Sequence, residues 1–121
     1  MELDHVNITA PMETLKQVRN FYTQILGLTE GERPNFKRAG FWLYGNGRAI
    51  LHLIEGEVSG EQPDKPYLDH IAFRAEALEP IKQRLDRLGI TSQQMDVPGR
   101  PLRQLVFFDP VGVKVEVNAR D

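Results

Sequence analysis

The sequence contains no cysteine, which excludes a disulfide framework, a thiolate metal ligand and a cysteine nucleophile. No apolar run approaches the roughly 18 residues that a membrane-spanning helix needs. Basic residues are not in excess either, because 15 Lys and Arg stand against 17 Asp and Glu, for a formal net charge of −2 at pH 7. Nucleic-acid binding usually requires a basic stripe. We therefore expect neither a nucleic-acid nor a membrane partner.

What remains is an ordinary globular composition. A chain of 121 residues with 40% hydrophobic content is large enough for one domain with a substantial core. The acidic start Met-Glu-Leu-Asp is unlike the positively charged beginning of a secretory signal. We therefore expect residues 1–121 to form a single cytoplasmic domain.

Only three histidines are present, and each lies in a run that is typical of a half-buried strand. They are His5, His52 and His70, and Glu116 lies in a fourth such run. The four runs are residues 3–8, 49–54, 68–73 and 113–117. Because strand side chains alternate between faces, the apolar residues of each run share one face and the three imidazoles and the carboxylate share the other.

The sequence repeats itself, which explains why these groups would converge. Leu3-Asp4-His5-Val6 returns 65 residues later as Leu68-Asp69-His70-Ile71, and Leu26-Gly27-Leu28-Thr29 returns 62 residues later as Leu88-Gly89-Ile90-Thr91. Residues 44–53 match 108–117 at an offset of 64, which aligns His52 with Glu116. Two copies related by an approximate twofold axis would place His5 opposite His70 and His52 opposite Glu116.

Each copy reads as a strand, a helix and three further strands. Pro11 and Pro80 open the two helices, and Gly27 and Gly89 end them. The later strands are expected near residues 29–33, 38–45, 48–54, 91–96, 103–109 and 112–118. Asn46-Gly47 and residues 109–112 are turn sequences. The prediction is an α+β fold of two βαβββ modules, residues 1–57 and 67–118, joined by a polar, proline-rich linker at 58–66.

This duplicated order, with LDHV opening one copy, LDHI opening the other and FFDPVGVKVEV closing the second, resembles the vicinal oxygen chelate superfamily. That family includes glyoxalase I, fosfomycin resistance enzymes, extradiol dioxygenases, methylmalonyl-CoA epimerase and bleomycin resistance proteins. The resemblance implies a cup-shaped, eight-stranded mixed sheet with pseudo-twofold symmetry and with the helices on its outer face. It also implies metal ligands on the first and fourth strands of each copy, which are His5, His52, His70 and Glu116 here.

Nitrogen and carboxylate ligands without sulfur favour one divalent transition metal ion, which could be iron, manganese, nickel, cobalt or zinc. A triad of His5, His70 and Glu116 would leave positions open for a bidentate substrate and a water. His52 is then a fourth ligand, an acid–base group or a lining residue. When bound, such a metal polarises substrate oxygens and stabilises an enolate or oxyanion, and Glu116 or His52 would move the proton.

Other residues of the predicted strands are candidates for substrate binding. Arg74, four residues after His70, and Arg103 would suit a carboxylate or phosphonate. Asn7 shares the polar face with His5, and Trp42 or Tyr44 would line the cup.

The resemblance leaves three functions open. The first is a metal-dependent lyase, transferase or isomerase of the glyoxalase and fosfomycin-resistance type, acting on a small oxygenated, anionic substrate. The second is a metal-free protein that sequesters a ligand, as bleomycin resistance proteins do, and the third is a small extradiol-type dioxygenase. The ionisable residues at all four ligand positions favour the enzyme. Small members of the family are commonly homodimers with the site near the interface, and we expect the same here.

Overall fold

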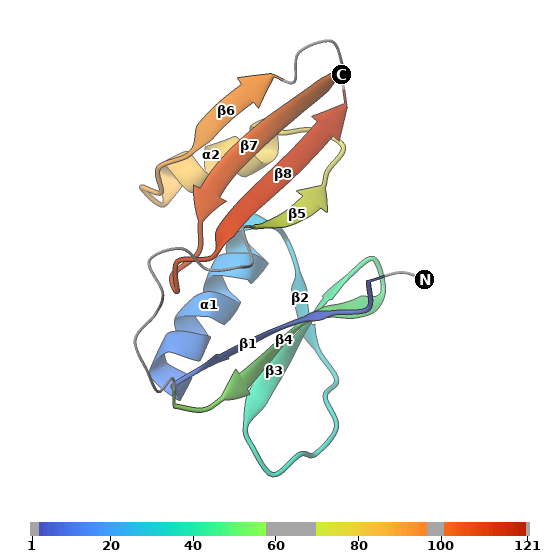
Figure 1. The fold of residues 1–121 in the computed structure, drawn as a ribbon, viewed down its shortest axis with the longest axis vertical. Coiled ribbons are helices and arrows are strands. Elements are labelled where there is room, and N and C mark those ends of the chain that lie inside the picture. The colour runs from blue at the N-terminus through green and yellow to red at the C-terminus, as the bar shows by residue number, and fades with distance from the viewer. Residues whose placement is uncertain (1–2, 58–69, 97–100, 121) are drawn as a thin grey trace. The chain divides into compact units, whose positions relative to one another are not determined.

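The computed structural model describes residues 3–57, 70–96 and 101–120 (Figure 1). The chain divides into two compact units, Met1–Glu61 and Gln62–Asp121. The predicted linker at 58–66 lies outside the described residues. In the described part of the chain, neither helix is long and apolar enough to cross a membrane.

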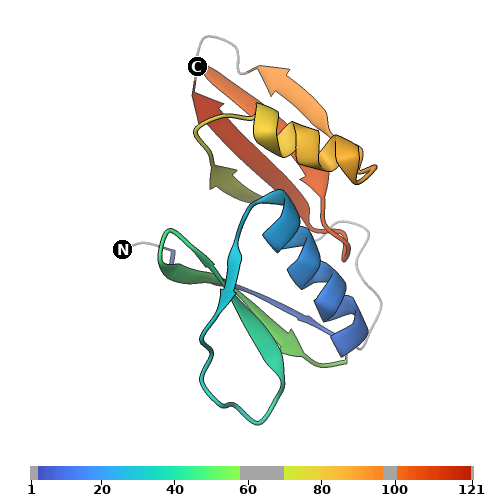
Figure 2. The same cartoon turned by 180° about the vertical axis from the view of Figure 1, so that it is seen from behind.

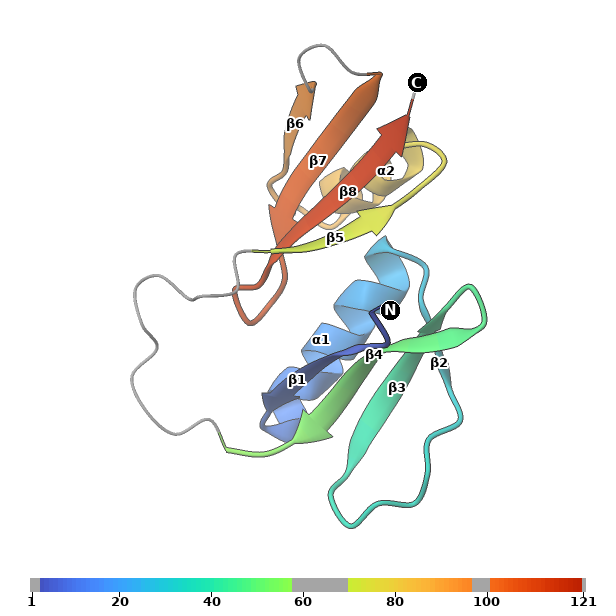
Figure 3. The same ribbon diagram turned by 45° about the vertical axis from the view of Figure 1, so that its right-hand side comes forward.

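The first unit contains one helix and a four-stranded mixed sheet. Its elements are β1 (Val6–Ala10), α1 (Met12–Ile25), β2 (Thr29–Gly31), β3 (Gly40–Gly45) and β4 (Arg48–Glu55). The strand order is β1-β4-β3-β2, with β1 parallel to β4 and the remaining neighbours antiparallel (Figure 3).

The second unit repeats this arrangement. Its elements are β5 (Ile71–Arg74), α2 (Glu79–Arg87), β6 (Gln93–Asp96), β7 (Leu102–Phe108) and β8 (Lys114–Arg120). The order is β5-β8-β7-β6, and again only the first pair is parallel. The two predicted βαβββ modules are therefore confirmed.

Strand register reproduces the repeat offsets at the level of single residues. His52 pairs with Asn7 on β1 and with Trp42 on β3. Glu116 occupies the corresponding place in the second sheet, opposite Ala72 and Val106. The alignment of His52 with Glu116, predicted from the sequence, is thus confirmed.

Both helices begin and end where the sequence predicts. Pro11 precedes α1 directly, and Pro80 occupies the first turn of α2, where a missing backbone N–H costs nothing. Gly27 and Gly89 follow the helices with φ of 71° and 70°, a left-handed conformation that glycine adopts without steric cost.

One face of each sheet forms the core against its helix (Figure 2). In the first unit Leu43, Leu51 and Leu53 are at most 1% exposed, and α1 packs on this face with Leu15, Val18, Tyr22 and Ile25. In the second unit the fully buried sheet residues are Leu105, Phe107, Val115 and Val117. The alternation predicted from the sequence therefore directs His52 and Glu116 to the other, open face of each sheet.

The first strand of each unit starts three residues later than the sequence predicts. His5 and His70 do not lie inside strands but immediately precede β1 and β5. The displacement is the same in both copies, so the two histidines remain equivalent. Their backbone is not part of the sheet ladder, and their orientation depends on side-chain contacts.

The turn between β7 and β8 carries the only buried charged residue among those described, Asp109, which is 5% exposed. Its carboxylate Oδ1 accepts hydrogen bonds from the backbone N–H groups of Val111 (2.9 Å) and Val113 (2.8 Å). The Asp109 N–H in turn donates to the carbonyl of Val113. This closes the hairpin that places Glu116.

Candidate metal and substrate site

Three rings stack on the open face of the first sheet. The His5 and His52 ring centroids are 3.8 Å apart with an interplanar angle of 10°, and the His52 and Trp42 centroids are 4.1 Å apart at 12°. The register explains the second contact, since Trp42 and His52 are directly opposite each other on β3 and β4. His52 is therefore covered on both ring faces.

Hydrogen bonds assign one free nitrogen to each histidine of this stack. The Nε2 of His52 lies 3.1 Å from the carbonyl oxygen of Ala49, which can only accept, so Nε2 carries the proton and Nδ1 keeps its lone pair. The Nδ1 of His5 lies 2.7 Å from the carboxylate of Asp4, which leaves Nε2 of His5 free. At metal sites, the ring nitrogen of a histidine that does not bind the metal commonly donates a hydrogen bond to a carboxylate, which orients the ring.

Charge and burial keep His52 neutral. Burial lowers the pKa of His52 below its usual value, the nearby His5 lowers it further, and the Ala49 carbonyl opposes both. The hydrogen bond from His5 lowers the pKa of Asp4. At neutral pH the first unit thus presents an unprotonated imidazole nitrogen beside an oriented His5.

Parallel stacking bears on whether His5 and His52 could share one metal ion. A ligating imidazole directs its lone pair in the plane of its ring, toward the metal. The two rings are 3.8 Å apart, so an ion midway between them would lie about 1.9 Å out of the plane of each ring. A metal–nitrogen bond is only about 2.1 Å long, so such an ion could not lie near either ring plane. The stack therefore suits one metal-ligating histidine and one neighbour that is not a ligand.

The second unit holds the other two candidate ligands as a pair. The Nε2 of His70 lies 3.6 Å from Oε2 of Glu116, and Nε2 of Gln104 donates to Oε1 of Glu116 at 2.7 Å. The Glu116 side chain is 13% exposed and that of His70 is 37% exposed. Gln104 thus orients a largely buried carboxylate toward a more accessible imidazole.

This spacing matches a shared ion. Two donors with bonds of about 2.1 Å and an angle of about 90–120° stand roughly 3.0–3.6 Å apart. Within residues 3–57, 70–96 and 101–120, no group of three or more His, Asp or Glu side chains is positioned to hold a metal. The four candidates instead form two pairs, one in each unit, and their nitrogen and oxygen donors are chemically suited to a divalent transition metal.

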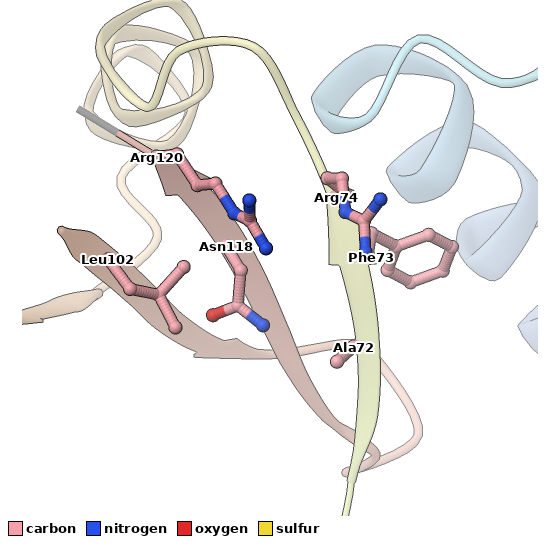
Figure 4. Close-up of a pocket in the computed structure, with 6 residues that line it drawn as sticks. All are labelled: Ala72, Phe73, Arg74, Leu102, Asn118 and Arg120. Carbon is pink, nitrogen blue, oxygen red and sulfur yellow. The ribbon is translucent and has the colours of Figure 1, made fainter. Parts of the chain in front are cut away.

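The two candidate arginines lie on opposite faces of the second sheet. Arg74 lines a hollow of about 280 Å³ on the open face (Figure 4). Arg103 has the same strand parity as the buried Leu105 and Phe107, and its guanidinium contacts the carboxylates of Glu79 (3.4 Å) and Asp96 (3.7 Å). Alternation directs this side chain away from the face of Glu116, so the structure does not bring Arg103 together with the other candidate residues of the second unit.

The remaining candidates lie in the first unit. Trp42 belongs to the ring stack. Asn7 is exposed beside His52 in the register, and its amide donates to the Thr9 hydroxyl at 3.0 Å. The Tyr44 hydroxyl already donates to the carbonyl of Glu32. The structure thus gathers Trp42 and Asn7 around His52, while the hydroxyl of Tyr44 is engaged in the fold.

Two residues of the open face are not singled out by the sequence patterns. Gln104 lies diagonally from Glu116 across the β7–β8 ladder, and Arg120 continues the parity of Glu116 along β8. Strand parity alone could have identified Arg120, because it lies four residues from Glu116 on the same strand, whereas Gln104 follows only from the register between β7 and β8.

Comparisons with known proteins agree with this architecture. The sequence model of the Glyoxalase/Bleomycin resistance protein/Dioxygenase superfamily matches residues 2–117. No curated protein matches the chain.

Solved structures with the same fold include several family members. A glyoxalase family protein from Bacillus anthracis is 25% identical, with 100% of this chain and 96% of that chain covered and a TM-score of 0.75. One from Enterococcus faecalis is 26% identical, with coverage of 97% and 96% and a TM-score of 0.70. A mutant of the fosfomycin resistance protein FosX from Listeria monocytogenes, complexed with Mn(II) and 1S,2S-dihydroxypropylphosphonic acid, is 19% identical, with coverage of 99% and 93% and a TM-score of 0.71.

Proposed function

Because the chain belongs to the Glyoxalase/Bleomycin resistance protein/Dioxygenase superfamily, also called the vicinal oxygen chelate superfamily, we propose that it is a metal-dependent enzyme of the glyoxalase and fosfomycin-resistance type. The reaction would be that of a lyase, transferase or isomerase. Its substrate would be a small oxygenated molecule with an anionic group. The observation that carries this proposal is the His70–Glu116 pair, which stands at ligand spacing and is braced by Gln104.

We propose His5, His70 and Glu116 as the ligands of one divalent ion, either iron, manganese, nickel, cobalt or zinc. The stack suits only one ligating histidine, and His5 is assigned because the carboxylate of Asp4 holds its Nδ1, whereas His52 is held only by the neutral carbonyl of Ala49. When bound, the metal would act as a Lewis acid that polarises neighbouring substrate oxygens and stabilises developing negative charge.

His52 and Glu116 remain the proposed proton carriers. The lowered pKa of His52 makes Nδ1 a lone-pair acceptor at neutral pH, and the bond to Ala49 orients the ring that bears it. A general base needs this combination of a free nitrogen and a defined orientation. Trp42 and His5 exclude water from both faces of the ring.

Metal content decides between the enzyme and the alternatives. We expect untagged protein, purified without chelators, to contain about one transition metal ion per chain by elemental analysis, since one ligand set is proposed. His5→Ala, His70→Ala and Glu116→Ala should each abolish metal retention, whereas His52→Ala should retain it. Glu76→Ala, which removes an exposed carboxylate of the second unit, is the matched control.

Full occupancy in Glu116→Ala would contradict the proposed ligand set. A metal-free protein that cannot be reloaded would favour the ligand-sequestering alternative. Retained iron with ring cleavage of a catechol would favour the dioxygenase.

We further propose that the protein is a cytoplasmic homodimer with the site near the interface, as in other small members of the family. The mass in solution at micromolar concentration tests the assembly, and a monomeric mass would contradict it.

A further inference from the structure

The hollow on the open face of the second sheet lies directly beside the Glu116 pair. Its lining comprises Ala72, Phe73, Arg74, Leu102, Asn118 and Arg120. Ala72 is the cross-strand partner of Glu116, and Arg74 is the partner of Asn118, one two-residue step further along β5 and β8. The hollow is therefore adjacent to the candidate ligand pair on the same face of the sheet.

Two arginines supply its charge. Both Arg74 and Arg120 are exposed, and within the described residues neither guanidinium forms a hydrogen bond or an ion pair. Figure 4 shows the Arg120 guanidinium extending from β8 toward β5, the strand that carries Arg74. Two unneutralised cations around one small hollow favour an anion, and a guanidinium suits carboxylate, phosphate and phosphonate oxygens in particular.

Asn118 adds a polar group that the fold does not use. It is located on β8 between Glu116 and Arg120, and its amide Oδ1 is buried without a hydrogen-bond partner in the described part of the chain. A buried amide without partners costs free energy unless a ligand completes its hydrogen bonds. Such a group next to two free guanidiniums is typical of a binding site rather than of a packed core.

From this arrangement we infer that Arg74, Arg120 and Asn118 form an oxyanion subsite for the end of the substrate distant from the reacting oxygens. The inference rests on the proposed function and adds to it the residues that bind the anionic group and the separation of that group from the reacting oxygens. Asn118 is two residues from Glu116, which is about 7 Å along a strand. The substrate would therefore be a small molecule whose carboxylate, phosphate or phosphonate is separated by a short carbon chain from the oxygens that react near Glu116, rather than one whose anionic group is itself the metal chelator.

Methylphosphonate and its neutral dimethyl ester provide matched probes for the subsite. Binding is measured by NMR titration of the whole, metal-free protein, so that the result does not depend on the metal. We expect methylphosphonate to shift the amide resonances of Arg74, Asn118 and Arg120, and the dimethyl ester to shift none of them. Added salt should weaken this binding because the arginines are exposed.

Arginine variants locate the binding. Arg74→Gln and Arg120→Gln should each lower the affinity for methylphosphonate by at least about fivefold, and the double variant should abolish binding. Arg87→Gln, which removes an exposed arginine of α2, should bind as the unmodified protein does. Unchanged affinity in Arg74→Gln and Arg120→Gln, or equal binding of the neutral ester, would overturn the subsite.

The subsite and the proposed function can fail separately. Arg74→Gln and Arg120→Gln should retain the metal of the unmodified protein, which supports a subsite separate from the ligands. Loss of metal in these two variants would overturn that separation. Binding of methylphosphonate through both arginines by a protein that cannot be loaded with metal would overturn the proposed enzyme and leave oxyanion recognition in place.

Discussion

The two units share a backbone plan but present different chemistry on their open faces. In the first, three rings stack across the sheet and cover the faces of His52. In the second, the equivalent position holds Glu116, which is braced by Gln104 and followed by a hollow with two arginines. The repeat thus preserves the positions of the ionisable groups but not their surroundings: the first unit presents aromatic surface and a neutral imidazole, and the second presents charge.

The two units share an equivalent core, and substitutions there should have the largest effect on the free energy of unfolding. Leu43 and Phe107 occupy equivalent buried positions, opposite Leu51 and Val115, with exposures of 0% and 1%. Leu43→Ala and Phe107→Ala should each lower the free energy of unfolding by about 3 kcal/mol, because each leaves a cavity.

Urea unfolding measures this loss, and Val111→Ala at an exposed turn position is the control. A cost below about 1 kcal/mol at either position would show that the equivalence does not extend to packing.

Gln104 belongs to the part of the second unit that differs from the first, because it has no counterpart in the ring stack. Gln104→Leu should weaken divalent metal binding about tenfold, since the Glu116 carboxylate loses the donor that orients it. Competition with a metallochromic indicator measures the affinity. Gln83→Leu on the exposed surface of α2 controls for a general effect of the substitution, and equal affinities in the two variants would refute an orienting role.

The smallest effect concerns the stack itself. A double-mutant cycle of Trp42→Leu and His52→Leu should give a coupling free energy of about 1 kcal/mol, because stacked aromatic pairs contribute beyond their buried area. The unfolding free energies of the four proteins yield this coupling directly. A coupling near zero would mean that the rings are adjacent without stabilising each other.

The repeat explains why so much of the fold was predictable. Nearly equal offsets, 65 residues for LDHV/LDHI and 64 for the two hairpins, define both modules, and alternation then assigns His52 and Glu116 to the open faces. The pairings of His5 with His52 and of Gln104 with Glu116 were not predictable in the same way. They depend on side-chain torsions and on a diagonal contact between strands, neither of which has a sequence period.

Arg103 shows what charge alone leaves open. Its charge and its place at a strand edge make it a candidate for substrate binding, whereas its parity with Leu105 and Phe107 assigns its side chain to the helix side. Its contact with Glu79, the first residue of α2, satisfies that charge there. The charge of a residue indicates what it could bind, but strand parity decides on which face of the sheet its side chain lies.

The Asp109 turn has a consequence for how this chain can change over evolution. Its carboxylate holds two backbone N–H groups of a hairpin loop, and the loop length sets the register of β8 against β7. The exposed Pro110 and Val111 can accept many substitutions, whereas one inserted residue would exchange the faces of β8. Glu116 would then enter the core and Val115 or Val117 would take its place, so this loop can vary in composition but cannot gain or lose a single residue.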